Sequence, residues 1–169
     1  MNKYKNIKAF SLIELLIALA LIGILVSLAS QMSNGLAKKT ANGAYRLLVK
    51  DISQARTFAG DPSLPYSSIL LIPKDGGSNS DWLKGWEIRA NSPSGQLLHS
   101  QSSFETDSVS ITSNEFSKTT PMFFSKKGYA NKTGQFTSKH TPCGQNTPSY
   151  IITVAKSGLT HTKKESCTP

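Results

Sequence analysis

The sequence predicts an α+β protein in which one long N-terminal α-helix, whose first half can cross a membrane, packs on an antiparallel β-sheet domain. An apolar run fills residues 10–30, and apolar side chains continue at helical spacing to about residue 58. After Pro62 the pattern changes to short apolar runs separated by clusters of Gly, Pro, Asn and Ser, which is typical of strands joined by turns. A chain of 169 residues holds one such domain together with the helical extension.

The apolar run from Phe10 to Ser30 is long enough to cross a bilayer as a helix. Lysines precede it at positions 3, 5 and 8. Because basic residues beside a membrane span stay in the cytoplasm, we expect a single span with the rest of the chain outside the cytoplasm. A secretory signal cut after Ser27-Leu28-Ala29 and a plain membrane anchor are two interpretations of this segment.

Neither interpretation explains Glu14, which lies inside the apolar run. A charge at the centre of a membrane helix costs about 2.5–3.5 kcal/mol, so it normally has a partner. A short basic leader followed by Ala9-Phe10-Ser11-Leu12-Ile13-Glu14 resembles the class III signal of type IV prepilins. The resemblance implies that a membrane-embedded prepilin peptidase cuts between Ala9 and Phe10 and methylates the new N-terminus at Phe10.

The family also implies a role for Glu14, which would attract the N-terminal amine of a neighbouring subunit during filament assembly. A carboxylate–ammonium pair is strong in a low dielectric and leaves neither charge unpaired. The family usually has Gly before the cut; Ala9 keeps the small size but can slow cleavage. The implied segments are a leader at 1–9, a transmembrane and filament-core helix at 10–30, an amphipathic continuation at 31–60 and a β-rich globular domain at 61–169.

The predicted helix continues beyond the membrane segment to about Phe58. Its inward face is formed by residues at helical spacing, namely Thr40, Ala44, Leu47, Leu48, Ile52, Ala55 and Ala59. Charged and polar residues, Arg56 among them, lie on the other faces. Gly60-Asp61-Pro62 ends the helix, which would be a rod of roughly 75 Å.

Short strands are expected after the helix, at 68–72, 85–90, 108–112, 122–125, 134–137 and 150–155. Lys156-Ser157-Gly158 joins the last of these to 159–162 as a terminal hairpin. Trp86 and Phe123 are expected to pack in the core. Most aromatic residues of the C-terminal third are likewise expected to be buried in strands, namely Phe123, Phe124, Tyr129, Phe136 and Tyr150.

The order of these features resembles the GspH/FimT group of pilin-like proteins. The resemblance rests on Gly85-Trp86-Glu87-Ile88, on Phe123 to Gly128 and on Ile151 to Gly158. The group includes the H pseudopilin of type II secretion, FimU-type minor pilins of pilus tips and FimT-type minor pilins of DNA uptake. It implies a pilin fold and other pilins and minor pilins as partners in a filament. It also implies a single span in the inner membrane with a periplasmic domain before assembly, and a place on the pilus or cell surface afterwards.

The net charge of +9 is uneven along the chain. Residues 61–117 hold seven acids and three bases, a net of −4, whereas 118–169 hold eight lysines and Glu165, a net of +7. The basic third is either a solvated face or a surface for polyanions. FimT-type proteins contact DNA through Gly-Arg-x-Arg, but Gly158-Leu159-Thr160-His161 lacks both arginines. Phosphate contacts by lysines stay open, the candidates being Lys126, Lys127, Lys156, Lys163 and Lys164.

Cys143 and Cys167 form no Cys-x-x-Cys motif, and in a chain outside the cytoplasm a disulfide is the default. FimU-type proteins often have a C-terminal disulfide. His140 and His161 leave a zinc site conceivable, but the spacing of His161 and Cys167 is unusual for zinc. We expect no metal or other cofactor, and no catalytic motif indicates an enzyme.

The predicted function is therefore structural: a minor pilin that helps to initiate or cap type IV pilus assembly. A DNA-binding minor pilin for natural transformation is the first alternative. A type II secretion pseudopilin is the second.

Overall fold

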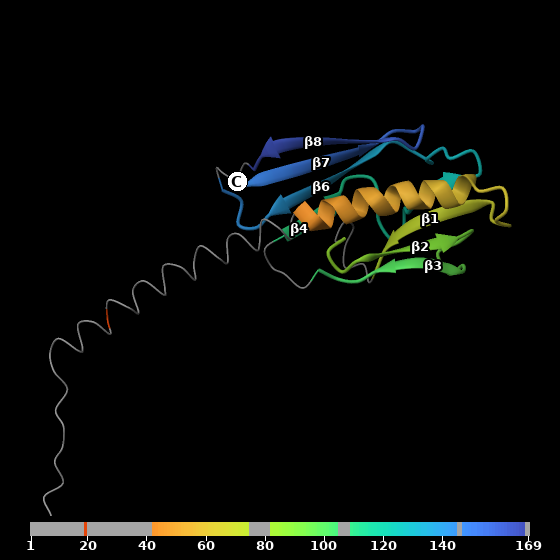
Figure 1. Ribbon diagram of the computed structural model, residues 1–169, viewed down its shortest axis with the longest axis horizontal. Helices are drawn as coiled ribbons and strands as arrows, with labels where there is room; N and C mark the ends of the chain where they lie inside the picture. Colours follow the sequence, from red (N-terminus) through yellow and green to blue (C-terminus); the bar gives the residue numbers. More distant parts are fainter. Residues whose placement is uncertain (1–18, 20–41, 75–81, 105–108, 145–146, 168–169) are drawn as a thin grey trace, which may run out of the picture. The chain divides into compact units, whose positions relative to one another are not determined.

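A computed structural model describes residue 19 and residues 42–74, 82–104, 109–144 and 147–167 (Figure 1). The chain forms two compact units, Met1–Leu36 and Ala37–Pro169, and the fold below is that of the second. The leader, the cleavage position, Glu14 and nearly all of the first half of the helix lie outside the described residues. Within the described ranges, no helix combines the length and apolar character that a membrane crossing needs.

The second unit contains a helix at residues 42–60 and two antiparallel four-stranded sheets (Figure 1). The first sheet has the order β3-β2-β1-β5, with β1 Ser68–Pro73, β2 Trp86–Ala90, β3 Leu97–Gln101 and β5 Met122–Ser125. The second sheet has the order β4-β6-β7-β8, with β4 Val109–Ser113, β6 Gly134–His140, β7 Pro148–Val154 and β8 Thr160–Ser166. The structure thus confirms a helix packed on antiparallel sheet.

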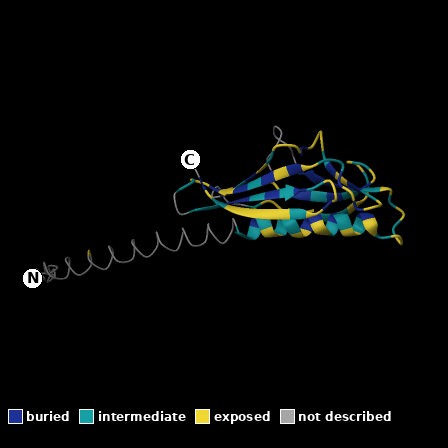
Figure 2. Ribbon diagram, turned by 90° about the horizontal axis from the view of Figure 1, so that it is seen from above, coloured by how far each residue is buried: buried dark blue, intermediate teal, exposed yellow. Residues whose placement is uncertain are grey.

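The helix forms because one face carries small and apolar residues at steps of three and four, and buried residues recur along it (Figure 2). Ala44, Leu48, Ile52, Ala55 and Ala59 are all buried, as the periodicity predicts. The helix ends at Gly60, where the prediction placed its end. The next residue, Asp61, accepts hydrogen bonds from the backbone N and the hydroxyl of Ser63, and these bonds lower the pKa of its carboxyl group.

One apolar core joins the helix to the inward faces of both sheets. Its largest fully buried side chains come from β2, β5 and β6 and from the loops beside them: Trp82, Trp86, Phe116, Phe124 and Phe136. Trp82 packs edge-to-face on Phe136, with ring centroids 4.9 Å apart, and so connects the β1–β2 loop to the second sheet. The burial of Trp86 matches the prediction.

Three sequence-based expectations about this unit need correction. Phe123 is 39% exposed and Phe124 is fully buried, because successive strand residues point to opposite faces. Tyr129 lies in the turn after β5 and is 54% exposed. Strand β3 was not predicted, since Leu-Leu-His-Ser-Gln shows no regular alternation and its pairing with β2 includes a bulge at Ile88/Arg89.

Candidate functional site

Two glycine turns form the centre of the basic C-terminal region. Gly128 and Gly158 have φ angles of 74° and 80°, a conformation that glycine adopts without steric cost. The Gly128 N–H donates to the Ser125 carbonyl at 2.7 Å, and the Gly158 N–H donates to the Ala155 carbonyl at 2.8 Å. The turns Lys126-Lys127-Gly128 and Lys156-Ser157-Gly158 are therefore closed in the same way.

The two turns lie against each other and against the helix. A Cβ atom on Gly158 would lie 2.3 Å from the Gly128 carbonyl oxygen and 2.9 Å from Arg56 Nε. Arg56 Nε donates to the same Gly128 oxygen at 3.3 Å, and the Ala130 N–H donates to the Lys156 carbonyl at 3.0 Å. Glycine at 158 is needed because only hydrogen fits between the second turn and Arg56.

This contact gathers four basic residues, Arg56, Lys126, Lys127 and Lys156, which we call the basic turn cluster. The three lysines are exposed, and Arg56 is half-buried. Sequence reasoning missed Arg56, which it placed only on a polar face of the helix. No local signal could have found it, because 72 residues separate Arg56 from its acceptor at Gly128.

Lys163 and Lys164 lie apart from the basic turn cluster, on β8. Lys163 pairs with Ile151 and Lys164 with Tyr150, so their side chains point to opposite faces of the sheet. Lys164 lies six positions after Gly158 in the chain, which is about 20 Å in extended conformation. Lys163 Nζ lies 2.8 Å from a Glu165 carboxylate oxygen, and this hydrogen bond and charge raise the pKa of Lys163. The structure therefore brings together Lys126, Lys127 and Lys156 but separates Lys163 and Lys164 from them.

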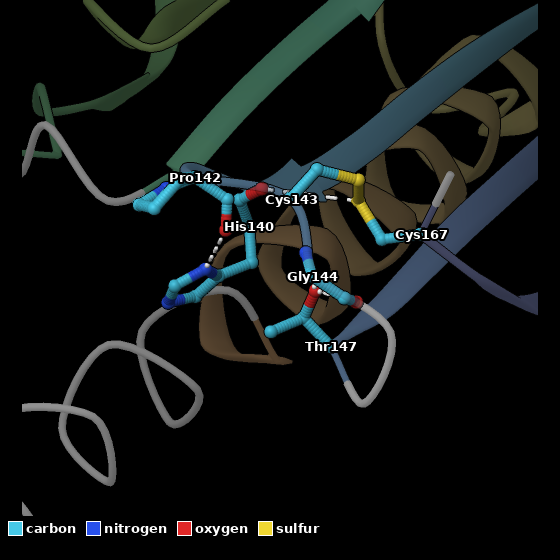
Figure 3. Close-up of a disulfide and its surroundings, with 6 residues drawn as sticks. All are labelled: His140, Pro142, Cys143, Gly144, Thr147 and Cys167. Atoms are coloured by element: carbon cyan, nitrogen blue, oxygen red, sulfur yellow. Dashed lines mark hydrogen bonds between the residues drawn. A yellow bond between two sulfur atoms is a disulfide. The ribbon is translucent and has the colours of Figure 1, made fainter. Parts of the chain in front are cut away.

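Cys143 and Cys167 form a disulfide with a Cα–Cα distance of 5.5 Å, the pairing that the sequence predicts (Figure 3). Cys143 follows β6 and Cys167 follows β8, so the bond ties the end of the terminal hairpin to the segment before its first strand. The Cys167 N–H also donates to the Thr147 carbonyl at 3.0 Å. The disulfide and this hydrogen bond therefore tie both sides of the β6–β7 loop to Cys167.

His140 stands beside this disulfide, with its Nδ1 donating to the Pro142 carbonyl at 3.0 Å (Figure 3). Both cysteine sulfurs are used in the disulfide. Among the described residues, no group of three His, Cys, Asp or Glu side chains could hold a metal ion.

Comparisons with known proteins find one sequence motif and one similar fold. The prokaryotic N-terminal methylation motif matches residues 4–30. A comparison with curated protein sequences gives no significant match. The structure of this chain is similar to crystal structures of the type IV minor pilin FimU from Pseudomonas aeruginosa strain PAO1 in two crystal forms. One is 15% identical with a TM-score of 0.57, covering 75% of this chain and 98% of FimU. The other is 14% identical with a TM-score of 0.58, covering 80% and 96%.

At these identities the likeness to FimU shows a shared fold, while the motif is a match in the sequence itself. The motif and the fold together confirm the predicted resemblance of this chain to type IV pilin-like proteins.

Proposed function

We propose that the protein is a minor pilin, a structural subunit that helps to initiate or cap a type IV pilus and is not an enzyme. The observation that carries this proposal is the presence of the methylation motif and a FimU-like fold in one chain. A contiguous N-terminal motif followed by a separately folded unit suits a subunit that inserts by its helix and displays its domain.

In this proposal the prepilin peptidase removes residues 1–9 and methylates Phe10. Residues 10–30 hold the protein in the inner membrane before assembly and enter the filament core afterwards. Residues 31–60 continue the helix, and the β-rich domain faces the periplasm and then the cell surface. Glu14 attracts the amine of a neighbouring pilin, since both charges would otherwise stay unpaired in a medium of low dielectric.

Mass spectrometry of the mature protein tests the processing step. We expect an N-terminus at Phe10 carrying a methyl group. An N-terminus at Ser30 would instead mean an ordinary secretory signal and would overturn the proposal.

Substitution of Glu14 tests the assembly step. Glu14→Ala should still insert into the membrane, because it removes a buried charge, but should be lost from sheared filaments. Glu14→Asp is the matched control, since it keeps the carboxylate. Equal amounts of the Ala variant and the unchanged protein in filaments would remove the role given to Glu14.

A second candidate function, binding of DNA by its phosphates, is favoured by the basic turn cluster. Three exposed lysines on two adjoining turns present several cations to one stretch of backbone, and such contacts need not read the sequence. Most of the aromatic residues here cannot supply stacking, because Phe124, Phe136 and Tyr150 are buried. Binding should therefore be sequence-independent and steeply dependent on salt.

Gel-shift titrations of residues 37–169 at two salt concentrations test this candidate. Lys126→Gln/Lys156→Gln should weaken binding and reduce the salt slope by about 2, because each lost phosphate contact removes about 0.9. Lys163→Gln/Lys164→Gln removes the same charge from β8 and should have the smaller effect. A larger effect of the β8 pair would move the site, and absence of any shift at low salt would exclude the function.

A further inference from the structure

The outward face of the first sheet, the side away from the helix, carries exposed apolar side chains. Leu97 on β3 is 46% exposed and Phe123 on β5 is 39% exposed. The strand register sets Leu97 opposite Arg89, Arg89 opposite Leu70, and Leu70 opposite Phe123. These four side chains therefore form one row across all four strands, with Leu70 almost buried between its neighbours.

The outward face of the second sheet has a different character. Residues that point away from its core are mostly polar and are half-buried or exposed, namely Ser110, Thr112, Gln135, Thr137, Lys139 and Thr153. This alternation of apolar inward and polar outward residues is expected of a sheet face that meets water. The first sheet breaks that pattern at Leu97 and Phe123, which lie on its two edge strands. Exposed apolar side chains on a sheet face are suited to contact with a protein partner.

A hollow of about 340 Å³ lies beside this row of four side chains and shares Arg89 with it. Its apolar lining includes Ile72, whose exposed fraction is 5%, and Pro73. Its charged lining consists of Lys74, Glu87, Arg89 and Lys118. We call this feature the outer hollow.

The charges of the outer hollow do not cancel. Arg89 Nε lies 2.6 Å from the Glu87 carboxylate, so these two residues neutralise each other, and Arg89 Nη1 donates to the Gly95 carbonyl at 2.9 Å. The ammonium groups of Lys74 and Lys118 make no ion pair with any residue of the described ranges. Because the one carboxylate in the lining, Glu87, is paired with Arg89, Lys74 and Lys118 leave the outer hollow with a net positive charge.

We propose that this face binds an acidic segment of a partner protein, with a carboxylate in the outer hollow between Lys74 and Lys118. An apolar side chain of the same segment would cover the exposed part of Phe123. The unpaired charges of Lys74 and Lys118 favour an acidic partner. The exposed side chain of Phe123 favours a protein segment over a simple polyanion, which has no apolar group to cover it. The surface is separate from the basic turn cluster, and the proposal does not depend on DNA binding.

A random 12-residue peptide library displayed on phage tests the proposal. Residues 37–169, kept oxidised, can serve as the target, because this unit has its own core and disulfide. Enriched peptides should contain Asp or Glu next to Leu or Phe. The enriched peptides are then synthesised with a fluorescent label, and their affinity is measured by fluorescence anisotropy.

Three variants locate the binding surface. Lys74→Gln/Lys118→Gln should weaken peptide binding by about tenfold and reduce its dependence on salt, since both expected ion pairs are lost. Phe123→Ser should also weaken it, and its unfolding midpoint is measured alongside, so that a loss of binding is told apart from a loss of folding. The matched control Lys50→Gln/Lys139→Gln removes two exposed cations from other surfaces and should keep the affinity.

Several outcomes would overturn the proposal. These are a failure to enrich any peptide, enrichment of peptides without acidic residues, or equal affinity for the unchanged domain and Lys74→Gln/Lys118→Gln. Sedimentation of the domain alone gives a further outcome that would overturn it. If the domain self-associates and Lys74→Gln/Lys118→Gln abolishes this, the face binds a second copy of this chain. A proposed pilus role could survive each of these results, because it rests on the N-terminal motif and the fold.

Discussion

The two sheets are attached to the same helix by different chemistry. In the first sheet, Trp86 Nε1 on β2 donates to the Asp51 carboxylate at 2.8 Å, and His99 Nε2 on β3 lies 3.3 Å from the same oxygen. Asp51 is 2% exposed. In the second sheet, Tyr150 on β7 stacks on Tyr45 of the helix, with centroids 4.0 Å apart and planes 16° from parallel.

This difference separates the energetic roles of the two sheets. A buried carboxylate is tolerated only where donors satisfy it, so the contacts of Trp86 and His99 with Asp51 add a polar attachment of β2 and β3 to the apolar core that both sheets share with the helix. The second sheet is held by a stacked ring, a hydroxyl bond from Tyr150 to the Asn42 side chain and, at its far edge, the disulfide. Four variants test this difference between the two sheets.

Removal of the disulfide should have the largest effect and should act on the second sheet. Closing a loop of 24 residues stabilises by about 3–4 kcal/mol in the chain-entropy model, so Cys143→Ser/Cys167→Ser should lower the free energy of unfolding by that amount. Denaturant unfolding measures the loss. Amide hydrogen exchange should accelerate in β8 before β1 and β2, and uniform acceleration in both sheets would contradict a separate role for the second sheet.

Gly158→Ala should come next, because it acts at the contact between the turns that follow β5 and β7. The new Cβ would meet the Gly128 carbonyl and would force a non-glycine residue to φ near 80°. We expect a loss of about 2–3 kcal/mol from the conformation and the overlap together. Ser157→Ala, one residue earlier and exposed, is the control. Equal stability of the two variants would show that the turns can move apart freely.

Asp51→Ala tests the polar attachment of the first sheet. It leaves Trp86 Nε1 buried without its acceptor, which should cost about 2 kcal/mol. Asp51→Asn keeps an acceptor oxygen and should lose less. A double-mutant cycle with Trp86→Phe measures the coupling between the two groups. If the Asn variant is as unstable as the Ala variant, the charge beside His99 matters more than the bond to Trp86.

Tyr150→Phe should have the smallest effect, about 1 kcal/mol, because it removes one hydroxyl bond and keeps the stacked ring. Thermal unfolding of this variant and of Asn42→Ala, alone and combined, gives the coupling. A loss as large as that of Asp51→Ala would remove the distinction between the two attachments.

Because of Tyr150, the free energy of unfolding should also depend on pH in the alkaline range. Burial raises the pKa of the Tyr150 hydroxyl above its usual value of 10.0. The folded state therefore holds this proton more tightly than the unfolded state, and its contribution is complete below pH 10 and falls as the pH rises beyond it. In the Phe variant the fall in unfolding free energy above pH 10 should be smaller than in the unchanged protein.

The sequence alone was sufficient where the signal is local. The N-terminal methylation motif is contiguous, so residues 4–30 could be recognised without a fold. The buried helix face follows from periodicity, because Ala44, Leu48 and Ile52 recur once per turn. The turn at 156–158 follows from its glycine, and the disulfide pairing from the presence of only two cysteines.

Only the tertiary structure decided which distant residues meet. Phe123 and Phe124 are alike in composition, and strand register alone placed the first outside and the second in the core. Strand β3 exists because β2 offers it a free edge, since its own sequence alternates poorly. Arg56 reaches Gly128, and Asp51 reaches Trp86, across 72 and 35 residues. Such contacts depend on how whole elements pack, and they cannot be predicted from the order of residue types along the chain.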